Sequence, residues 1–365
     1  MSELDLLRGV VVALGVAHKL ARWPNPTEPG EREIGRLRTA FYREVWGEAA
    51  ASVGGALREV HGSLLEVTCP GGRLRVRKNE TSLDDPVTVA LAADKALVLD
   101  LVARRGIPVP RHEVCRFDEV ARAVRFARAV ARPCVVKPAR FGIGGLGVTT
   151  GVRRRDEFVS ALAYARVYDP EVVVEELVVG GVYRLLYLDG ELLDAVLRLP
   201  PCVVSDGTST VDELVERENR RRLEQGIAAA QTLVKRDREL RSTLHEQGLR
   251  LGTVAPAGTV VRLKRVVNDN CREDNRAALA SVCRAVADAG AEAAAAVGLR
   301  LAGVDIITPD PGRPLERAGG VVLEVNSGPG LYYHYMRAGP GVPVATLILE
   351  RLAAASRRGS QVTGV

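Results

Sequence analysis

Aromatic residues are scarce in this chain. Only 4% of its 365 residues are Phe, Trp or Tyr, although 47% are hydrophobic. Proteins that bind single-stranded nucleic acid stack bases on aromatic rings, and other nucleic-acid-binding proteins concentrate their basic residues in one stripe. The net charge of +6 comes here from Lys and Arg that alternate with Asp and Glu. The sequence therefore favours anionic small molecules, such as nucleotides, phosphates and carboxylates, over nucleic acid.

Clustered cysteines and long apolar runs are also missing. The six cysteines form no CxxC pair and no cluster with histidine, which argues against a sulfur-ligated zinc site and indicates reduced thiols in a cytoplasmic protein. The apolar run over residues 4–20 is interrupted by Asp5 and Arg8, and it is shorter than the roughly 18 residues of a spanning helix. We expect an amphipathic helix there, with neither a signal peptide nor membrane association.

The chain is too long for one ordinary domain, which holds roughly 100–200 residues. Strands and helices alternate from about residue 93 onward, and this alternation indicates an α+β or α/β body. We predict an N-terminal α/β accessory segment over residues 1–92, a second part over 93–178, a third part over 179–355 and a C-terminal tail over 356–365.

Several local patterns predict individual elements. Two strands flank the turn Asp189-Gly190 and read as a hairpin. Thr210, followed three residues later by Glu213, begins a helix with a capping box. The pattern also predicts a strand over 259–266 and one long Ala-rich helix over 275–297, which Gly298 ends.

A lysine and a glycine-rich loop follow one apolar strand. The strand carries Lys137, and the loop contains Gly142, Gly144, Gly145 and Gly147. Bare backbone N–H groups in such a loop bind phosphate oxygens. The loop also fits GxGxxG, but the β-branched residues after it oppose the helix that a Rossmann fold requires, and no Gly-Lys-Ser/Thr of a P-loop is present. A purely structural glycine loop is the remaining alternative.

Carboxylates lie on three further apolar strands. Asp305 is followed 19 residues later by Glu324, and Asn326 shares a strand face with Glu324. Two carboxylates and an amide oxygen suit magnesium that bridges substrate phosphates, whereas pairing with arginine is the alternative. Glu175 and Glu176 point to opposite sides of a strand that ends at Leu177, and its edge suits adenine if the pair is not simply solvated.

Four cations lie on strands that lead toward this carboxylate set. Arg184 and Arg198 belong to the predicted hairpin, and Lys264 and Arg265 belong to the predicted strand over 259–266. A guanidinium offers a planar fork for phosphate or carboxylate. Any one of them alone reads as a surface charge, but four on strands near one predicted metal site indicate an anionic ligand.

From about Asp94 to Ala355 the chain resembles ATP-grasp ligases, most closely the ATP-grasp portion of cyanophycin synthetase and the bifunctional glutathione synthetases. The resemblance rests on residues 93–95, 136–138, 174–177, 205–219, 303–306 and 323–326, with Gly328 and His334 beyond them. It implies an ATP-grasp fold, in which two α+β lobes grip ATP, over the second and third parts of the chain.

The resemblance also implies a role for each site residue. Lys95 and Lys137 would hold the ATP phosphates under the loop Gly142–Gly147, and Glu175, Glu176, Leu177 and Val178 would form the adenine hinge. Asp305, Glu324 and Asn326 would chelate two Mg²⁺ ions, with Mn²⁺ as a substitute. Arg184, Arg198, Lys264 and Arg265 would neutralise the transferring phosphoryl group. Asn268, Gly328 and His334 would contact the substrates.

Three departures from the family pattern are visible. No acidic residue for the ribose follows the hinge at Gly180-Gly181-Val182, and residues 268–275 replace a Ser/Thr/Gly-rich substrate loop. The second ligase domain of cyanophycin synthetase has no counterpart in this sequence, so we do not expect full cyanophycin synthesis.

We expect an ATP-dependent carboxylate–amine ligase that activates an amino acid or small peptide as an acyl phosphate. Its partners would be a small-molecule acid and amine, and a homodimer is possible. The alternatives are a kinase of the same fold and a nucleotide-binding module without catalysis. Lys137→Ala is expected to abolish turnover and leave the fold intact, because it removes a phosphate contact and no core volume.

Overall fold

A computed structural model describes residues 30–70, 72–140, 145–229 and 232–362. The predicted N-terminal helix over 4–20, as well as Gly142 and Gly144, lie outside the described residues. Every strand pairing in the described part is antiparallel, and the strands form four sheets. No helix within the described residues combines the length and apolar character that crossing a membrane requires.

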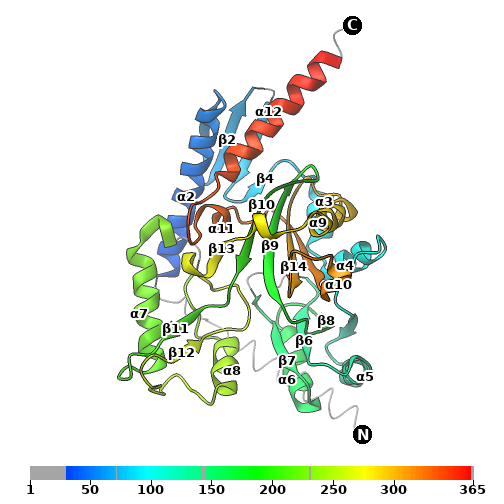
Figure 1. The fold of residues 1–365 in the computed structure, drawn as a ribbon, viewed down its shortest axis with the longest axis vertical. Coiled ribbons are helices and arrows are strands. Elements are labelled where there is room, and N and C mark those ends of the chain that lie inside the picture. Colours follow the sequence, from blue (N-terminus) through cyan, green and yellow to red (C-terminus); the bar gives the residue numbers. More distant parts are fainter. Residues whose placement is uncertain (1–29, 71, 141–144, 230–231, 363–365) are drawn as a thin grey trace.

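The central sheet has five strands in the order β13-β10-β9-β14-β15 (Figure 1). Their bounds are Asn275–Ala277 for β13, Glu191–Arg198 for β10, Gly181–Leu188 for β9, Leu301–Thr308 for β14 and Val321–Ser327 for β15. Asp189 and Gly190 have φ of 49° and 80°, as a two-residue type I′ turn requires. The predicted hairpin is therefore confirmed.

Helices cover one face of the central sheet. The bounds are Pro86–Ala92 for α3, Lys95–Ala103 for α4, Arg284–Val297 for α9 and Leu315–Ala318 for α10. Val98 and Val102 of α4 and Val286 and Val297 of α9 are buried in one cluster with the apolar residues of β9, β14 and β15. The opposite face is thus the one left for polar side chains.

A second sheet, in the order β5-β8-β6-β7, forms the small lobe. Its elements are β5 His112–Arg116, α5 Val120–Val130, β6 Cys134–Pro138, β7 Thr149–Val152, α6 Arg155–Ala165 and β8 Glu171–Glu176. Helices α5 and α6 pack on the sheet, where Phe158 and Leu162 are fully buried among valines of β6 and β8. In Figure 1 this lobe lies below the central sheet.

Residues 200–270 form a separate unit with its own core, beside the small lobe in Figure 1. It contains β11 Cys202–Val204, α7 Val211–Glu224, α8 Arg238–Glu246 and β12 Val260–Arg262. The capping box that begins α7 is confirmed, since the Glu213 N–H donates to Thr210 Oγ1 at 3.3 Å and the Thr210 N–H donates to Glu213 Oε2 at 2.7 Å. Arg238 of α8 donates to Ser160 Oγ of the small lobe at 2.9 Å.

Two predicted elements are wrong in this region. The strand predicted over 259–266 ends at Arg262, so Lys264 and Arg265 lie in the irregular segment after it. The long helix predicted over 275–297 begins only at Arg284. Asn275–Ala277 instead pair with Val196–Arg198 and complete the edge of the central sheet, a long-range pairing that overrides the local helix preference.

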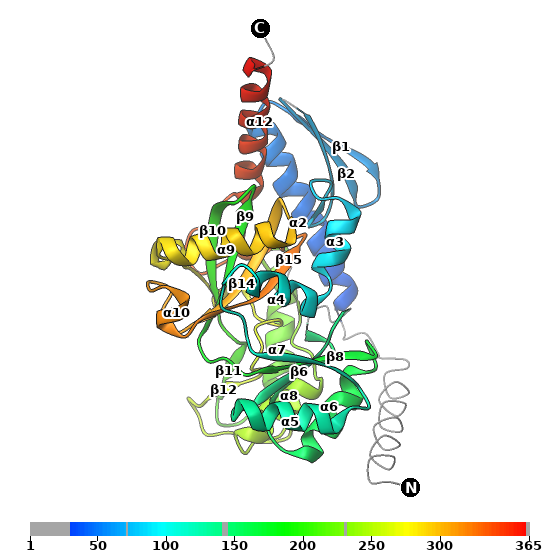
Figure 2. The ribbon, with the colours of Figure 1, turned by 90° about the vertical axis from the view of Figure 1, so that its right-hand side faces the viewer.

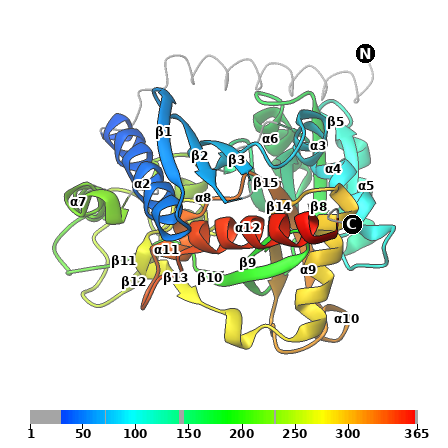
Figure 3. The same cartoon turned by 90° about the horizontal axis from the view of Figure 1, so that it is seen from above.

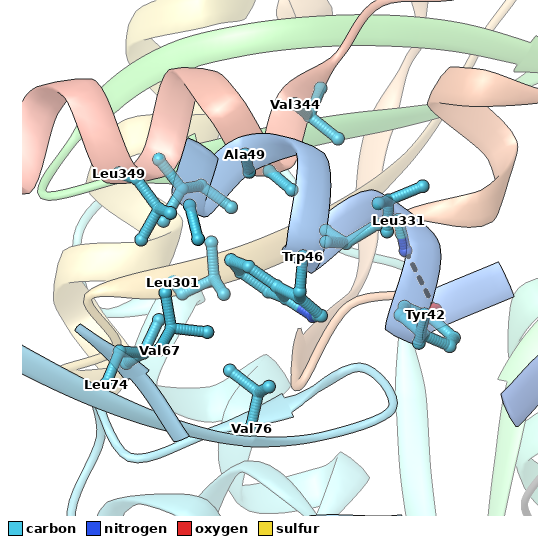
Figure 4. Close-up of a cluster of buried hydrophobic side chains, with 14 of the residues drawn as sticks. Tyr42, Trp46, Ala49, Val67, Leu74, Val76, Leu301, Leu331, Val344 and Leu349 are labelled. Atoms are coloured by element: carbon cyan, nitrogen blue, oxygen red, sulfur yellow. Dashed lines mark hydrogen bonds between the residues drawn. The ribbon is translucent and has the colours of Figure 1, made fainter. Parts of the chain in front are cut away.

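The N-terminal sheet packs against the rest of the chain through a shared core. The elements are α2 Glu31–Ser52, β1 Ala56–His61, β2 Leu64–Cys69, β3 Gly72–Arg77, β4 Glu80–Thr81, α11 Tyr332–Tyr335 and α12 Val344–Val362. Figure 4 shows Trp46 of α2 among Val67, Val76, Leu301 and Leu349, which come from four different elements. Within the described residues 30–92, the buried apolar side chains of α2, β2 and β3 therefore belong to a core shared with the rest of the chain.

Helix α12 continues to Val362, so it extends into the predicted C-terminal tail over 356–365, and the predicted division of the chain stays a prediction. Figures 2 and 3 show α12 rising beside α2 and crossing over β9 and β10. Contacts of α12 with both α2 and β10 agree with these views. Helix α12 thus helps to support α2.

Replacing Trp46 by Ala tests this shared core. Trp46 is fully buried, so we expect its loss to lower the free energy of unfolding by about 3–5 kcal/mol. Denaturant unfolding measures the change, with Val60→Ala on β1 as a control, because Val60 is 42% exposed and its truncation should cost less than about 0.5 kcal/mol. Equal effects of the two substitutions would contradict the shared core.

Candidate active site

Three charged residues form a row across the face of the central sheet that α4 and α9 do not cover. Arg184 on β9 is the cross-strand partner of Asp305 on β14, and Asp305 is the partner of Glu324 on β15. Cross-strand partners point to the same side of a sheet, so the three side chains lie next to one another. We call Arg184, Asp305 and Glu324 the charged row. It lies on the face opposite α4 and α9.

The centre of the row is a buried ion pair. Arg184 Nε lies 2.5 Å from Asp305 Oδ1, and Arg184 Nη2 lies 2.8 Å from Asp305 Oδ2. The two residues are 8% and 5% exposed. Burial alone would lower the pKa of Arg184, but the charge of Asp305 and its hydrogen bonds outweigh burial and raise that pKa. The guanidinium is therefore a permanent cation at this position.

Gly303 makes room for Arg184. It lies two residues before Asp305 on the same face of β14. A Cβ at Gly303 would lie 3.2 Å from Arg184 Cδ and 2.8 Å from Pro329 Cβ in the loop that follows β15. The missing side chain admits both the arginine stem and this loop, a role that the sequence pattern did not indicate.

Lys95 connects the row to the small lobe. Its Nζ lies 3.1 Å from Glu324 Oε1, and its backbone N–H donates to the carbonyl oxygen of Ala139, directly after β6, at 3.0 Å. Lys137, near the end of β6, pairs with Glu175 of the neighbouring strand β8 at 2.7 Å, and both side chains are almost fully buried. The start of α4 and the end of β6 therefore present the two predicted phosphate lysines together.

The electrostatics of Glu324 show that these groups converge. Burial raises the pKa of Glu324, but the charges of Lys95, Lys137 and Arg184 outweigh burial and hold that pKa below its usual value of 4.5. Glu324 is therefore a carboxylate at neutral pH. Asn326 lies one step along the same face, where its Nδ2 donates to the Gly303 carbonyl oxygen at 3.3 Å. The structure thus brings together Lys95, Lys137, Arg184, Asp305, Glu324 and Asn326.

This donor set fits a divalent cation that shares its coordination with phosphates. Asp305, Glu324 and Asn326 offer carboxylate and amide oxygens, which are the hard ligands that Mg²⁺ prefers. The described residues contain no group of three or more His, Cys, Asp and Glu that could hold a metal ion by themselves. Two carboxylates and one amide therefore call for phosphate oxygens or water to complete the coordination, as Mg²⁺ at a nucleotide does.

The predicted adenine hinge is only partly open. Glu175 points toward Lys137, so its carboxylate is held by the lysine. The Glu176 N–H donates to the Arg111 carbonyl oxygen at 2.9 Å, and the Leu177 N–H donates to the Pro133 carbonyl oxygen at 2.8 Å. Glu175 thus acts on the position of Lys137, and the next residue, Val178, is the better candidate for an adenine contact.

The described end of the glycine loop contacts the unit formed by residues 200–270. Gly145 and Gly147 have φ of 79° and 78°, which other residues rarely adopt. Asn268 Nδ2 lies 2.5 Å from the position that a Cβ of Gly145 would take. Asn268 is therefore beside the predicted phosphate loop, although we expected it at the substrates.

Lys264 and Arg265 form ion pairs with carboxylates that do not belong to the charged row. Lys264 is 3% exposed and pairs with Asp237 at 2.7 Å and with Asp269. Burial lowers the pKa of Lys264, but the two aspartates outweigh burial and raise that pKa. Arg265 pairs with Glu246 and lies against Gly151 of β7. These contacts join α8 to its surroundings, and they leave the catalytic roles implied for the two residues as predictions.

Arg198 is buried without a carboxylate partner in the described part of the chain. It is 3% exposed, and its Nη2 donates to the Val267 carbonyl oxygen at 2.9 Å. Its Nε is buried and has no hydrogen-bond partner among the described residues. The ring centre of Tyr333 lies 4.2 Å from the Arg198 Cζ and 5.8 Å from the Arg184 Cζ. Arg198 therefore offers an unused donor beside the row.

The loop after β15 carries the other predicted substrate residues. The Gly328 carbonyl oxygen accepts a hydrogen bond from Asn79 Nδ2, and the Leu331 N–H donates to Tyr42 Oη at 3.2 Å. The N-terminal segment therefore holds this loop over the sheet. His334 Nδ1 lies 2.7 Å from Asp194 Oδ2, and both residues are fully buried.

Sequence reasoning missed Asn79, Tyr42, Tyr333, Asp194 and Arg337. Arg337 Nη1 lies 2.9 and 3.2 Å from the two oxygens of Asp194, which completes a buried group with His334. Asp194 had a usable signal, a single carboxylate within the apolar strand β10. The other four residues gave none, because their roles depend on contacts between distant parts of the chain.

The chain is similar in sequence to several known proteins. The family described as "D-ala D-ala ligase C-terminus" matches residues 101–184. Cyanophycin synthetase of Nostoc sp. is 30% identical over 293 residues, which cover 76% of this chain and 31% of that protein. The glutathione biosynthesis bifunctional protein of Streptococcus mutans is 30% identical over 281 residues, 75% of this chain and 37% of that protein. The chain thus spans about a third of the length of these relatives.

A solved structure agrees with the sequence relatives. A bifunctional glutathione synthetase from Pasteurella multocida matches with a TM-score of 0.52 at 22% identity, over 84% of this chain and 44% of that one. The fold, with lysines on two elements facing carboxylates on a central sheet, is an ATP-grasp fold, as predicted. The chain belongs to the ATP-grasp family and is a relative of cyanophycin synthetases and bifunctional glutathione synthetases.

Lys137→Ala should affect both the fold and the site. Its removal leaves the Glu175 carboxylate buried without its partner, so we expect a loss of about 3–5 kcal/mol in the free energy of unfolding, contrary to the expectation from sequence. The double substitution Lys137→Met with Glu175→Gln removes both charges and should recover most of this loss. Denaturant unfolding of the three variants measures it. An unchanged stability of Lys137→Ala would contradict the buried pair.

Proposed function

We propose that this protein is an ATP-dependent ligase that joins the carboxylate of an amino acid or small peptide to an amine. The observation that carries the proposal is the convergence of Lys95, Lys137 and the charged row on one face of the central sheet. The relatives support it, because one is named cyanophycin synthetase and another is named a glutathione biosynthesis bifunctional protein. Two steps follow from this function: phosphorylation of the carboxylate to an acyl phosphate, and attack by the amine with release of phosphate.

Different residues of the site would bind the phosphates, the adenine and the metal ions of ATP. Lys95 and Lys137 would hold the phosphates under the glycine loop, and Val178 would contact the adenine. Asp305, Glu324 and Asn326 would hold two divalent cations, Mg²⁺ or Mn²⁺, which neutralise phosphate charge when bound. Asp305 is paired with Arg184 and Glu324 with Lys95, so each carboxylate has a partner within the chain that a bound cation would replace.

Arg184 and Arg198 serve the acid substrate. Both guanidinium groups are nearly buried, and Tyr333 lies over both, so water has little access to them. Fixed donors in such a place stabilise developing negative charge strongly, because they need no reorganisation. Arg198 has an unused Nε and would bind the acyl phosphate. Arg184 exchanges part of its contact with Asp305 for the transferring phosphoryl group.

The substrates enter near the loop after β15. Gly328 and His334 lie in or beside that loop, and the N-terminal segment shapes it through Asn79 and Tyr42. We infer that this segment helps to select the substrates. A homodimer and a cytoplasmic location remain predictions.

Trapping with hydroxylamine tests the function without knowledge of the amine. Hydroxylamine attacks acyl phosphates directly, so a panel of amino acids and dipeptides with ATP and Mg²⁺ should give an acid-dependent hydroxamate together with ADP and phosphate. Glu324→Gln should reduce hydroxamate formation at least about 100-fold, since a carboxylate at the phosphates is lost. Glu292→Gln on α9, an exposed pair with Arg105, is the matched control.

Three results would contradict the ligase. A stable phosphorylated acid in the mass spectrum, without hydroxamate, would show a kinase. ATP binding without acid-dependent turnover would show a binding module. Equal hydroxamate formation by wild type and Glu324→Gln would remove the charged row from the reaction.

A further inference from the structure

The buried residue His334 has one ring nitrogen without a hydrogen-bond partner among the described residues. His334 Nδ1 contacts Asp194 Oδ2 at 2.7 Å, while Nε2 is buried and has no hydrogen-bond partner among the described residues. A buried polar atom without a partner is costly in a folded protein, so such atoms often mark a place where a ligand binds. Nothing in the binding of ATP or of the acid uses this atom.

Asp194 and Arg337 decide which nitrogen carries the proton. Arg337 Nη1 lies 2.9 and 3.2 Å from the two oxygens of Asp194, so the carboxylate is ion-paired with this guanidinium. A carboxylate accepts hydrogen bonds, so the ring nitrogen that faces it, Nδ1, is the one that donates. In the neutral imidazole Nε2 then has a free lone pair, which is the form of a base.

His334 is held on the side of the central sheet that carries Arg184. Asp194 on β10 is the cross-strand partner of Leu186, two residues from Arg184 on the same face of β9. Of the two guanidinium groups that lower the pKa of His334, Arg184 has the larger effect, even though Arg337 shares Asp194 with the histidine. The charge of Arg184 thus acts on His334, and the preceding residue, Tyr333, lies over Arg184 and Arg198.

The surroundings keep the imidazole neutral. Burial is the largest influence and lowers the pKa of His334; Asp194 on β10 opposes it, and Arg184 on β9 and Arg337 after α11 add to it. The net pKa is below the usual 6.5. The base form therefore persists at neutral pH and somewhat below it, whereas an unperturbed histidine would be half protonated near pH 6.5.

We propose that His334 is the general base of the second step, with Asp194 and Arg337 as positioning residues. The inference rests on the proposed function. An amine arrives largely as an ammonium ion, which has no lone pair for attack. Nε2 removes a proton from it, the amine nitrogen forms a bond to the acyl carbon, and the bond from that carbon to the phosphate oxygen breaks. Phosphate leaves with the electron pair, and the second amine proton passes to phosphate or water.

Other groups on this face are unsuited to the task. Asp305 is paired with Arg184 and Glu324 with Lys95, and both carboxylates are assigned to the metal. Lys137 is paired with Glu175, so neither lysine is free to accept a proton. His334 is covered in the absence of substrates, so contact with the amine forms only in the substrate complex, as is common for catalytic hydrogen bonds.

Hydroxylamine and an ordinary amino acid, used in turn as the acceptor, separate the second step of the reaction from the first. Hydroxylamine is largely uncharged at neutral pH and needs no base, whereas an ordinary amino acid does. For His334→Asn, whose amide keeps a donor toward Asp194, we expect hydroxamate formation within about threefold of wild type. Amide formation at pH 7 should fall about 100-fold or more, the usual contribution of a general base. Amide formation in the variant should rise with pH as free amine accumulates. His61→Gln on β1, an exposed histidine, is the control.

The outcomes separate the two proposals. An equal loss of hydroxamate and amide would show that His334 has only a structural role, and unchanged amide formation would also overturn the base. No hydroxamate from wild-type protein with any acid of the panel would overturn the ligase and the base together. A normal unfolding midpoint of His334→Asn is required, and His334→Gln repeats the test if Asn destabilises the fold.

The protonation of wild-type His334 provides a test that needs no substrate. Long-range ¹H–¹⁵N NMR correlations at pH 7 should show a neutral ring with the proton on Nδ1. A proton on Nε2 or a charged imidazolium would overturn the proposal, whatever the kinetics show.

Discussion

The ion pair between Arg184 and Asp305 is the interaction on which the site depends. Two charges in a nearly dry position are tolerated only when they neutralise each other with good geometry, and here two short contacts do so. Because the pair lies in register across β9 and β14, it also fixes which residues of the sheet face the substrates. A slip of one residue would send Asp305 into the apolar cluster under α4 and α9.

The same pairs prepare the protein for ligands. Glu324 is held by Lys95, and Lys137 is held by Glu175, so each charge has a protein partner before nucleotide arrives. Under the proposed function, phosphate groups would replace the carboxylates as partners of the lysines, and divalent cations would replace the lysines and arginine as partners of the carboxylates. The exchange needs little movement, since the groups already converge. This explains why the predicted metal and phosphate residues appear as ion pairs with one another.

The central site was predictable from sequence because its signals are local. Asp305, Glu324 and Asn326 are polar residues in apolar strands, and the Asp189-Gly190 turn fixes the hairpin by its own backbone preference. The failures share a different cause. The edge strand β13 and the pairing of Glu175 with Lys137 depend on partners far away in the chain. Gly303 likewise gains its meaning only from Arg184 and Pro329.

Buried charges in this protein fall into two kinds, and the difference bears on function. Lys264 has two aspartate partners, and Asp194 is paired with both Arg337 and His334. The charges of Lys264 and Asp194 are therefore compensated within the chain. Arg198 Nε and His334 Nε2 are equally buried but lack a partner among the described residues. A fold gains nothing from leaving a buried donor and a buried acceptor unused. Arg198 lies against the ring of Tyr333, and His334 follows Tyr333 in the chain. Under the proposed function, the acid and the amine would supply the missing partners of these two atoms.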